Sequence, residues 1–208
     1  EGASRFLSRL WRLVTEELSG LLTPVAPCAP AESLGIDGLP PIFAELRRRE
    51  HAAAAKAGAD IRERFQFNTA IAAAMELVNF LYANVESLRA EPKGAKAVSS
   101  AVGTLLTVLS PIAPHICEEL WQGIGHTTLL IEQPWPAHDP SALVTDEVEI
   151  VVQVCGKLRG KISVARDAGK EEVERAALAE ANVVKHIEGK TIRKVIVVPG
   201  KLVNVVAN

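Results

Sequence analysis

Two β-rich segments separated by one helix constrain the fold of this chain more than any other feature. Residues 148–164 read VEIVVQVCGKLRGKISV, and residues 189–208 read GKTIRKVIVVPGKLVNVVAN. Alternating β-branched residues are typical of strands, and Gly156 and the Pro199–Gly200 pair mark the turns. The residues between the two segments, 170–187, have helical apolar spacing. The order β-β-α-β-β predicts a small α+β domain.

Apolar residues recur at helical spacing through much of the chain before these segments. Prolines at 111 and 114 interrupt the pattern, and Ser4 is a candidate cap for the first helix. Short connections between such helices favour an antiparallel bundle. The predicted helices are 5–18, 42–64, 67–87, 95–109 and 115–122.

Helical periodicity disappears between residues 123 and 146, where Trp135 lies between Pro134 and Pro136. Such a density of proline favours an extended segment or linker, and residues 20–41 predict a loop for the same reason. We therefore expect an α+β protein with two domains. The expected parts are a helical bundle over 1–122, a Pro-rich linker over 123–146 and a small β-β-α-β-β domain over 147–208.

The two expected domains differ in charge. The chain has a net charge of −2, which argues against a general nucleic-acid-binding protein. Residues 1–145 contain 12 Lys and Arg against 16 Asp and Glu, whereas residues 146–208 contain 11 against 9. The two β segments are the basic part, which suits contact with a phosphate backbone.

The basic residues of the β segments form two clusters. Lys157, Arg159 and Lys161 occupy every second position, which predicts three cations on one face of a hairpin. We predict that both clusters bind phosphates of RNA or DNA; the alternative is that they are edge charges that keep a small sheet soluble. The predicted RNA-binding residues are Lys157, Arg159, Lys161, Lys190, Arg193, Lys194 and Lys201.

A second set of cations runs along the first predicted helix. Arg5, Arg9 and Arg12 recur at i, i+4 and i+7, so they form a stripe on one side of that helix. A solvated helix face is the common explanation of such a stripe, and a secondary RNA contact is the alternative. The same two explanations apply to Arg47–Arg49 beside Lys56.

The sequence contains no recognisable catalytic or metal-binding constellation. His115 and Cys117 lie two apart on a short predicted helix, so they point in different directions, and no second Cys/His pair completes a zinc site. There is no phosphate loop, dinucleotide fingerprint or nucleophile elbow. We expect no catalytic residue, metal or cofactor in this chain. The rival hypothesis is a small-molecule enzyme that uses His115 or Cys117.

Cysteine usage and hydropathy indicate the compartment. Three cysteines, an odd number at no metal-ligand spacing, indicate reduced thiols and a cytoplasmic protein. No segment approaches a membrane span and no leader peptide opens the chain, so we expect no membrane partner. The chain starts with Glu rather than Met, as a piece of a longer protein would.

Several stretches together resemble the C-terminal part of bacterial leucyl-tRNA synthetases. They are RFLSRLWRLV, FQFNTAIAAAMELVNFLY, LSPIAPHICEELWQ and the pair VQVCGKLRGKISV and GKTIRKVIVVPGKLVNVVAN. SPIAPHICEELW is also similar to synthetases for isoleucine, valine and methionine, whereas the last pair resembles leucyl enzymes alone. The resemblance covers nearly the whole chain. It implies a helical anticodon-binding domain followed by the C-terminal domain.

This resemblance implies tRNA binding rather than catalysis. The ATP-site motifs and the editing domain of the family are missing, so this chain alone should be inactive. The parent enzyme would join leucine to its tRNA with ATP and Mg²⁺. The implied partners are leucine-specific tRNA and the catalytic and editing domains of the same enzyme. In the family the C-terminal domain contacts the tRNA elbow, a role that we carry onto the seven cations predicted above.

One residue departs from the family pattern, and two alternatives stay open. Cys155 stands where many relatives have Asn, which predicts a looser hairpin turn. The first alternative is a protein–protein interaction module or structural helical module. The second is the equivalent fragment of an isoleucyl- or valyl-type synthetase.

Overall fold

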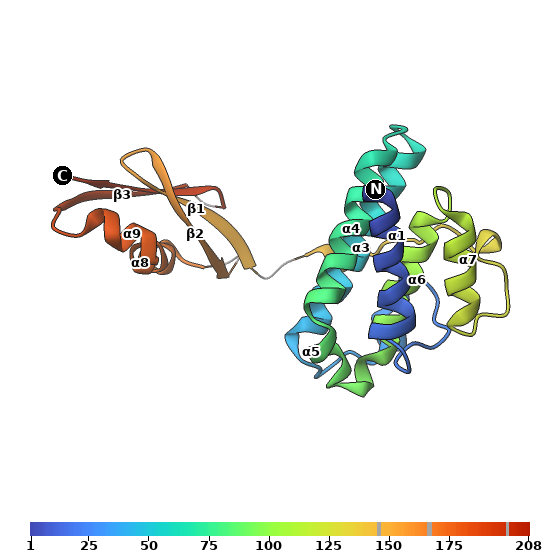
Figure 1. The fold of residues 1–208 in the computed structure, drawn as a ribbon. Coiled ribbons are helices and arrows are strands. Elements are labelled where there is room, and N and C mark those ends of the chain that lie inside the picture. Colours follow the sequence, from blue (N-terminus) through green and yellow to red (C-terminus); the bar gives the residue numbers. More distant parts are fainter. Residues whose placement is uncertain (145–146, 166–167, 199) are drawn as a thin grey trace. The chain divides into compact units, whose positions relative to one another are not determined.

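The computed structural model describes residues 1–144, 147–165, 168–198 and 200–208 (Figure 1). The chain forms two compact units, Glu1–Val144 and Thr145–Asn208, called unit 1 and unit 2 below. Unit 1 is helical and unit 2 combines helices with a sheet, which confirms the predicted α+β class. The segment 123–146, expected to be a linker, belongs to unit 1 as far as Val144. Its last two residues lie outside the described ranges.

Unit 1 contains helices of three kinds. Its α-helices are α1 (Gly2–Arg12), α2 (Ala31–Leu34), α3 (Pro41–Arg62), α4 (Phe67–Ala83), α5 (Val85–Arg89), α6 (Ala95–Leu109) and α7 (Pro114–Gly123). The π-helix is η1 (Leu13–Glu17), and the 3-10 helices are η2 (Pro92–Gly94), η3 (Leu130–Glu132) and η4 (Pro140–Leu143). Proline begins α3 and α7 because the first amides of a helix need no acceptor within it.

The first predicted helix differs from the structure at both ends. Ser4 is not its cap, because α1 already begins at Gly2. Beyond α1 the backbone widens into the π-helix η1, where the Leu18 N–H donates to the Leu13 carbonyl at 2.9 Å. This i→i−5 bond replaces the expected α-helical bond.

The predicted helix 67–87 is two helices. It breaks at Asn84, whose φ of −125° is not helical. The Asn84 side-chain amide donates to the Phe80 carbonyl at 2.7 Å, so it ends α4 by taking one of the carbonyls that α4 leaves unpaired. The Pro-rich loop 20–41 also contains the one-turn helix α2.

Helix α6 forms the centre of unit 1. All residues from Ala97 to Leu109 are buried. This stretch has no charged residue, and its Ser, Thr and Gly side chains are small enough for neighbouring helices to approach closely. Those neighbours include α3, α4 and α7, which add Leu46, Leu77 and Trp121 to the same core.

Buried polar groups attach the Pro-rich loop to α3 and α6. The Glu50 carboxylate accepts hydrogen bonds from the Cys28 N–H at 2.9 Å, from Ser100 at 2.7 Å and from Thr104 at 2.8 Å. Arg47 donates to the Ala29 carbonyl at 2.8 Å. Burial raises the pKa of Glu50. A loop of this composition is therefore fixed by hydrogen bonds from the helices it crosses.

The extended segment after α7 is attached to α3 in the same way. Arg47 forms an ion pair with Asp139 at 3.0 Å, and the Asp139 N–H donates to Nδ1 of His51 at 2.9 Å. Burial and the nearby Arg47 charge lower the pKa of His51 to about 4. Earlier in the same segment, the centre of the Trp135 ring lies 5.5 Å from Cζ of the Arg62 guanidinium.

Unit 2 is a four-stranded sheet with helices on one face (Figure 1). Its elements are β1 (Glu147–Val154), β2 (Lys157–Ala165), α8 (Lys170–Ala179), α9 (Ala181–Ile187), β3 (Ile192–Val198) and β4 (Leu202–Ala207). The strand order is β2-β1-β4-β3, and β1 runs parallel to β4. The core lies between the sheet and the helices and includes Val152, Val203, Val205, Val173, Ala177 and Val183.

The predicted helix 170–187 is interrupted at Glu180. This residue has ψ of 129°, and its carboxylate accepts the Val183 N–H at 2.7 Å, so it caps α9. The predicted Pro199–Gly200 turn is described only at Gly200, which has φ of 64°. Pro199 lies outside the described residues.

Candidate RNA-binding surface

The sheet face opposite α8 and α9 is open and carries two rows of side chains across all four strands. The first row is Leu158–Gln153–Asn204–Ile196, and the second is Lys161–Val151–Leu202–Val198. We call these eight residues, with the adjacent Val206 and Lys194, the open face. Exposed fractions are 60% for Leu158, 40% for Ile196 and 37% for Val198. The open face thus combines accessible aliphatic side chains with the amides of Gln153 and Asn204 and a lysine at each outer strand.

The first cationic cluster is divided between the two faces of the sheet. Lys157 pairs with Val154, which is buried on the helix-covered face, whereas Lys161 pairs with Val151 on the open face. The pairing shifts beside Arg159, which is an extra residue and forms a β-bulge. The prediction of three cations on one face was therefore wrong, because a bulge reverses the alternation of side chains.

The second cluster also contains a bulge. The β3–β4 pairing shifts around Arg193, whose guanidinium faces the Asn208 amide oxygen at 2.8 and 3.2 Å when that amide is oriented to accept. Lys194 then pairs with Val206 on the open face. Lys190 lies just before the start of β3, whereas Lys201 precedes β4 at the other end of the sheet.

The sheet register brings most of the predicted cations to one end. The turn after β1, the start of β3 and the end of β4 lie together, since the Cys155 N–H donates to the Val205 carbonyl and Thr191 pairs with Asn208. Lys157, Lys190, Arg193 and Lys194 therefore belong to this end, and Lys161 and Lys201 belong to the opposite one.

In the described part of the chain, one of the seven predicted cations forms an ion pair. Lys161 pairs with Glu149 at 2.7 Å, where both side chains are more than half exposed. Within the described ranges, the other six predicted cations have no carboxylate at ion-pair distance. Exposed pairs such as Lys161–Glu149 add little stability and exchange readily for another anion. The sheet edges are therefore positively charged.

The turn between β1 and β2 is tight and strained. Cys155 has φ of 49° and Gly156 has φ of 76°, the left-handed pair of a two-residue hairpin turn. The Gly156 N–H donates to Oδ1 of Asn204 at 3.1 Å, and the Cys155 thiol contacts the Ala207 carbonyl at 3.2 Å. Asn204 thus links the open face to the turn that precedes Lys157.

The cationic stripe on α1 divides into three different environments. Arg12 pairs with Glu16 at 3.3 Å and Glu17 at 3.6 Å. Arg9 donates to Oδ1 of Asn79 at 2.6 Å and lies 4.6 Å from the centre of the Tyr82 ring, so it is held without an acidic partner. Arg5 is exposed. Arg9 is thus the member of the stripe whose guanidinium is oriented by neighbouring side chains without an ion pair among the described residues.

The basic run on α3 is already engaged. Arg47 is buried and bound to the Ala29 carbonyl and Asp139. Arg48 and Arg49 both bind Glu45, at 2.7 and 2.6 Å. The Arg48 hydrogen bond lowers the pKa of Glu45. This run stabilises unit 1, and we do not include it in the candidate surface.

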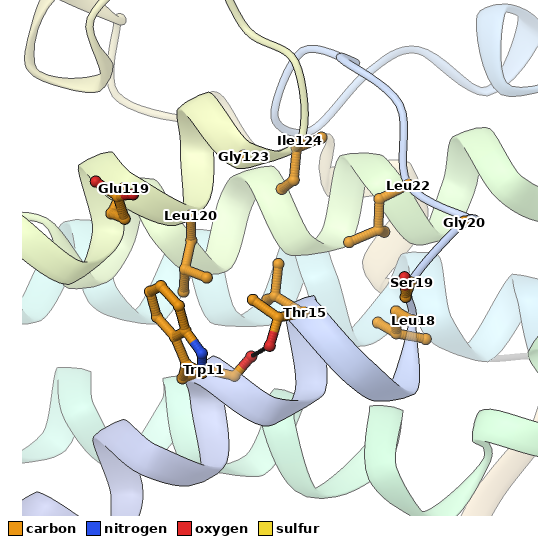
Figure 2. Close-up of a pocket in the computed structure, with 11 residues that line it drawn as sticks. Trp11, Thr15, Leu18, Ser19, Gly20, Leu22, Glu119, Leu120, Gly123 and Ile124 are labelled. Atoms are coloured by element: carbon orange, nitrogen blue, oxygen red, sulfur yellow. Dashed lines mark hydrogen bonds between the residues drawn. The ribbon is translucent and has the colours of Figure 1, made fainter.

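A pocket of about 370 Å³ lies between α1, η1 and α7, and Figure 2 shows the residues that line it. Its walls are mainly apolar, with the half-exposed Trp11 beside Leu120 and Ile124, and Glu119 is its acidic side chain. The Thr15 hydroxyl is occupied by a hydrogen bond to the Trp11 carbonyl at 2.9 Å. Sequence reasoning missed this pocket because a π-helix, which widens the backbone here, has no simple sequence signal.

The candidates for catalysis or metal binding, His115, Cys117 and Cys28, are separated from one another or buried. Burial raises the pKa of the Cys117 thiol to about 12, and that of Cys28 likewise to about 12. His115 lies exposed at the start of α7, whereas Cys117 is buried. Among the described residues, no group of three His, Cys, Asp or Glu side chains is placed to hold a metal ion.

The fold and the surface define an α+β protein in which a helical bundle is followed by a basic sheet unit. Residues 44–174 match the family described as the anticodon-binding domain of tRNA ligase. This match covers more than half of the chain, so the chain belongs to that family. Within the described part, no helix is long and apolar enough to cross a membrane.

The individual relatives are tRNA ligases for leucine. The leucine–tRNA ligase of Oleidesulfovibrio alaskensis is 54% identical over all 208 residues, and that of Marinobacter nauticus is 47% identical. The chain spans 25% and 23% of their lengths. A solved ternary complex of Agrobacterium radiobacter K84 agnB2 LeuRS, tRNA and LeuAMS matches the whole chain with a TM-score of 0.74 and 27% identity. The chain covers 25% of that protein.

Proposed function

We propose that this chain is the tRNA-binding part of a leucyl-tRNA synthetase and that it docks the body and elbow of leucine-specific tRNA. Its relatives are leucine–tRNA ligases, and its solved structural neighbour was crystallised with tRNA. The observation that carries the proposal is the open face of unit 2, which has a lysine at each outer strand: Lys194 has no carboxylate at ion-pair distance among the described residues, and Lys161 has only the exposed pair with Glu149.

The composition of unit 2 limits how it can contact RNA. All nine Phe, Trp and Tyr residues of the chain precede residue 145, so unit 2 has none of these rings to stack on a base. The aliphatic side chains of the open face can instead pack against a flat base pair or a sugar. Lys161 and Lys194, at the two outer strands, then reach phosphates on either side. Such contacts recognise the shape of folded RNA rather than its sequence.

Salt dependence follows from this arrangement. If the cations of unit 2 neutralise about four phosphates, the log–log slope of affinity against salt is about −3 to −4. The Lys161–Glu149 pair lowers the contribution of Lys161, since Glu149 must release the ammonium first. Arg9 on α1 adds a secondary contact from unit 1, because its guanidinium is already oriented by Asn79 and Tyr82.

Catalysis belongs, in this proposal, to other parts of the parent enzyme. The parent joins leucine to tRNA in the cytoplasm with ATP and Mg²⁺, and this chain orients the tRNA for the catalytic and editing domains. The chain alone should not form aminoacyl-adenylate. An ATP–pyrophosphate exchange assay with leucine would detect any such activity.

The test of the proposal is filter binding of this chain to leucine tRNA, another tRNA and a hairpin RNA at two salt concentrations. We expect salt-sensitive binding that favours folded tRNA. Replacing both Lys194 and Lys201 with Glu should lower the affinity and leave the circular dichroism spectrum unchanged. The control is Lys170→Glu on α8, where Lys170 already faces Glu174. Equal losses in the control and the double variant, or no binding at low salt, would refute the proposal.

A further inference from the structure

The connection between α3 and α4 exposes two phenylalanines at one end of unit 1. Phe65 is 75% exposed, and Phe67, the first residue of α4, is 44% exposed. Phe65 also has φ of 54°, in the left-handed region that a bulky residue rarely adopts. Glycine at this position would end α3 with less strain and would expose no apolar surface. A phenylalanine at position 65 therefore does not stabilise unit 1 by itself.

The backbone that presents these rings is well fixed. The Gln66 N–H donates to the Asp60 carbonyl at 2.8 Å, and the Thr69 hydroxyl donates to the Gln66 carbonyl at 2.9 Å. The Asp60 side chain is buried and binds Lys56 at 3.0 Å and Arg64 at 3.3 Å. An ordered, strained turn with exposed aromatic rings is typical of a binding surface rather than of a flexible loop.

Helices α1 and α4 run in the same direction with a constant offset. Arg9 bonds to Asn79 through its side chain and to Tyr82 through its carbonyl, and Arg89 donates to the Glu17 and Ser19 carbonyls. Each of these contacts joins residues 70 to 73 apart in sequence. In Figure 1 the N-terminus and the α3–α4 connection accordingly lie at the same end of unit 1.

This offset locates the phenylalanines relative to the start of α1. Glu1 lies level with residues 71–74 of α4, so Phe67 is four to seven residues farther along. At 1.5 Å per helical residue, this distance is about 6–10 Å. Any polypeptide that leads into α1 along this direction passes beside Phe67.

We propose that Phe65 and Phe67 form a docking surface for the part of the full-length polypeptide that leads into α1. The matched leucine–tRNA ligases are about four times as long as the region they share with this chain, so they hold ample sequence to cover it. Two exposed aromatic side chains, two residues apart on an ordered turn, are suited to fill an apolar depression on that part. The docked turn then sets the orientation of unit 1 in the full-length protein.

The charges around the turn favour a protein partner over RNA. Lys56 and Arg64 share the buried Asp60 carboxylate, and Arg62 lies over the Trp135 ring. Lys56 and Arg64 are therefore already engaged in ion pairs. A base stacked on Phe65 would find Arg62 as its nearest exposed cation without an ion pair among the described residues.

Hydrogen exchange of residues 62–70 tests the proposal in two polypeptides, this 208-residue chain and the full-length enzyme. The first amides of α4 have no acceptor within the helix, so they should exchange rapidly in the shorter chain. In the full-length enzyme docking should slow them about tenfold or more. Equal exchange rates in the two polypeptides would overturn the proposal.

The variant Phe65→Gly separates docking from a structural role. It should leave the unfolding temperature of the shorter chain unchanged or higher, because glycine relieves the left-handed strain. In the full-length enzyme it should restore rapid exchange of residues 62–70. The control is Ile131→Ala in η3, where Ile131 is 82% exposed and should have no effect on that exchange.

The variant Phe65→Gly also tests the alternative that Phe65 and Phe67 bind RNA. One result would show that the surface binds RNA and that the docking proposal is wrong. In that result Phe65→Gly weakens binding of leucine tRNA to the shorter chain, and residues 62–70 exchange equally in both polypeptides. Failure of the unmodified chain to bind any tRNA would refute the proposed function and leave the exchange result interpretable by itself.

Discussion

Replacing Gly160 with alanine should destabilise unit 2 only while Glu180 is present. A Cβ at residue 160 would lie 2.5 Å from Oε2 of Glu180 and 2.6 Å from its Cδ. The carboxylate must therefore move away, and it then loses the 2.7 Å hydrogen bond from the Val183 N–H that caps α9. Loss of a helix cap of this kind costs about 1 kcal/mol.

A second effect of the same substitution has the opposite sign. Gly160 does not have a left-handed backbone, so alanine is compatible with its conformation. Replacing glycine under these conditions restricts the unfolded chain and contributes about 0.4–1 kcal/mol of stability. The net change should therefore be a loss of at most about 0.6 kcal/mol. With Glu180→Ala already present, Gly160→Ala should become stabilising, and the double-mutant cycle should give a coupling of about 1 kcal/mol.

The assay must report on unit 2 alone. Fluorescence cannot do so, since every Trp and Tyr lies in unit 1. Amide exchange of the buried β1 and β4 residues gives the required free energies. The control is Gly169→Ala, where the added Cβ has no atom within 4 Å and should not couple to Glu180→Ala. A coupling indistinguishable from that of the control would refute the reasoning.

Three further predictions concern the turn, a buried histidine and the core. Cys155→Asn should stabilise unit 2 by about 0.5–1 kcal/mol, because Asn tolerates the left-handed φ of 49°, and amide exchange would show it. The unfolding free energy of unit 1, followed by Trp fluorescence, should fall by about 1–3 kcal/mol between pH 6.5 and 4 through His51. The pKa of His51 is lowered to about 4 in the folded state, so the unfolded state binds the proton first as the pH falls. His51→Gln should remove this contribution to the pH dependence of the unfolding free energy. Leu106→Ala should cost about 2–5 kcal/mol in the same fluorescence assay, because Leu106 is fully buried in α6.

The sequence allowed the fold class and most helices to be predicted, because long apolar stripes leave few alternatives. Helix α6 is the clearest case, since every residue from Ala97 to Leu109 is buried. The breaks at Asn84 and Glu180 were missed. At both positions a side chain takes over a backbone hydrogen bond, and that choice depends on local geometry rather than on apolar spacing.

The candidate surface was predictable in composition but not in arrangement. The cations of unit 2 could be found by counting charges. The two bulges, at Arg159 and Arg193, could not be found in that way, because a bulge changes the register without changing the residue pattern. The two rows of the open face became visible only when the strand order placed β4 beside β1.

The position of β4 inside the sheet has a consequence for biosynthesis. Residues 202–207 are the last strand of unit 2 to be translated, yet they pair with both β1 and β3. Until they leave the ribosome, the β1–β2 hairpin has an unpaired inner edge and β3 has no neighbour in the sheet. Unit 2 must therefore fold in one late step, and a nascent chain stalled before residue 202 would expose strand edges prone to aggregation.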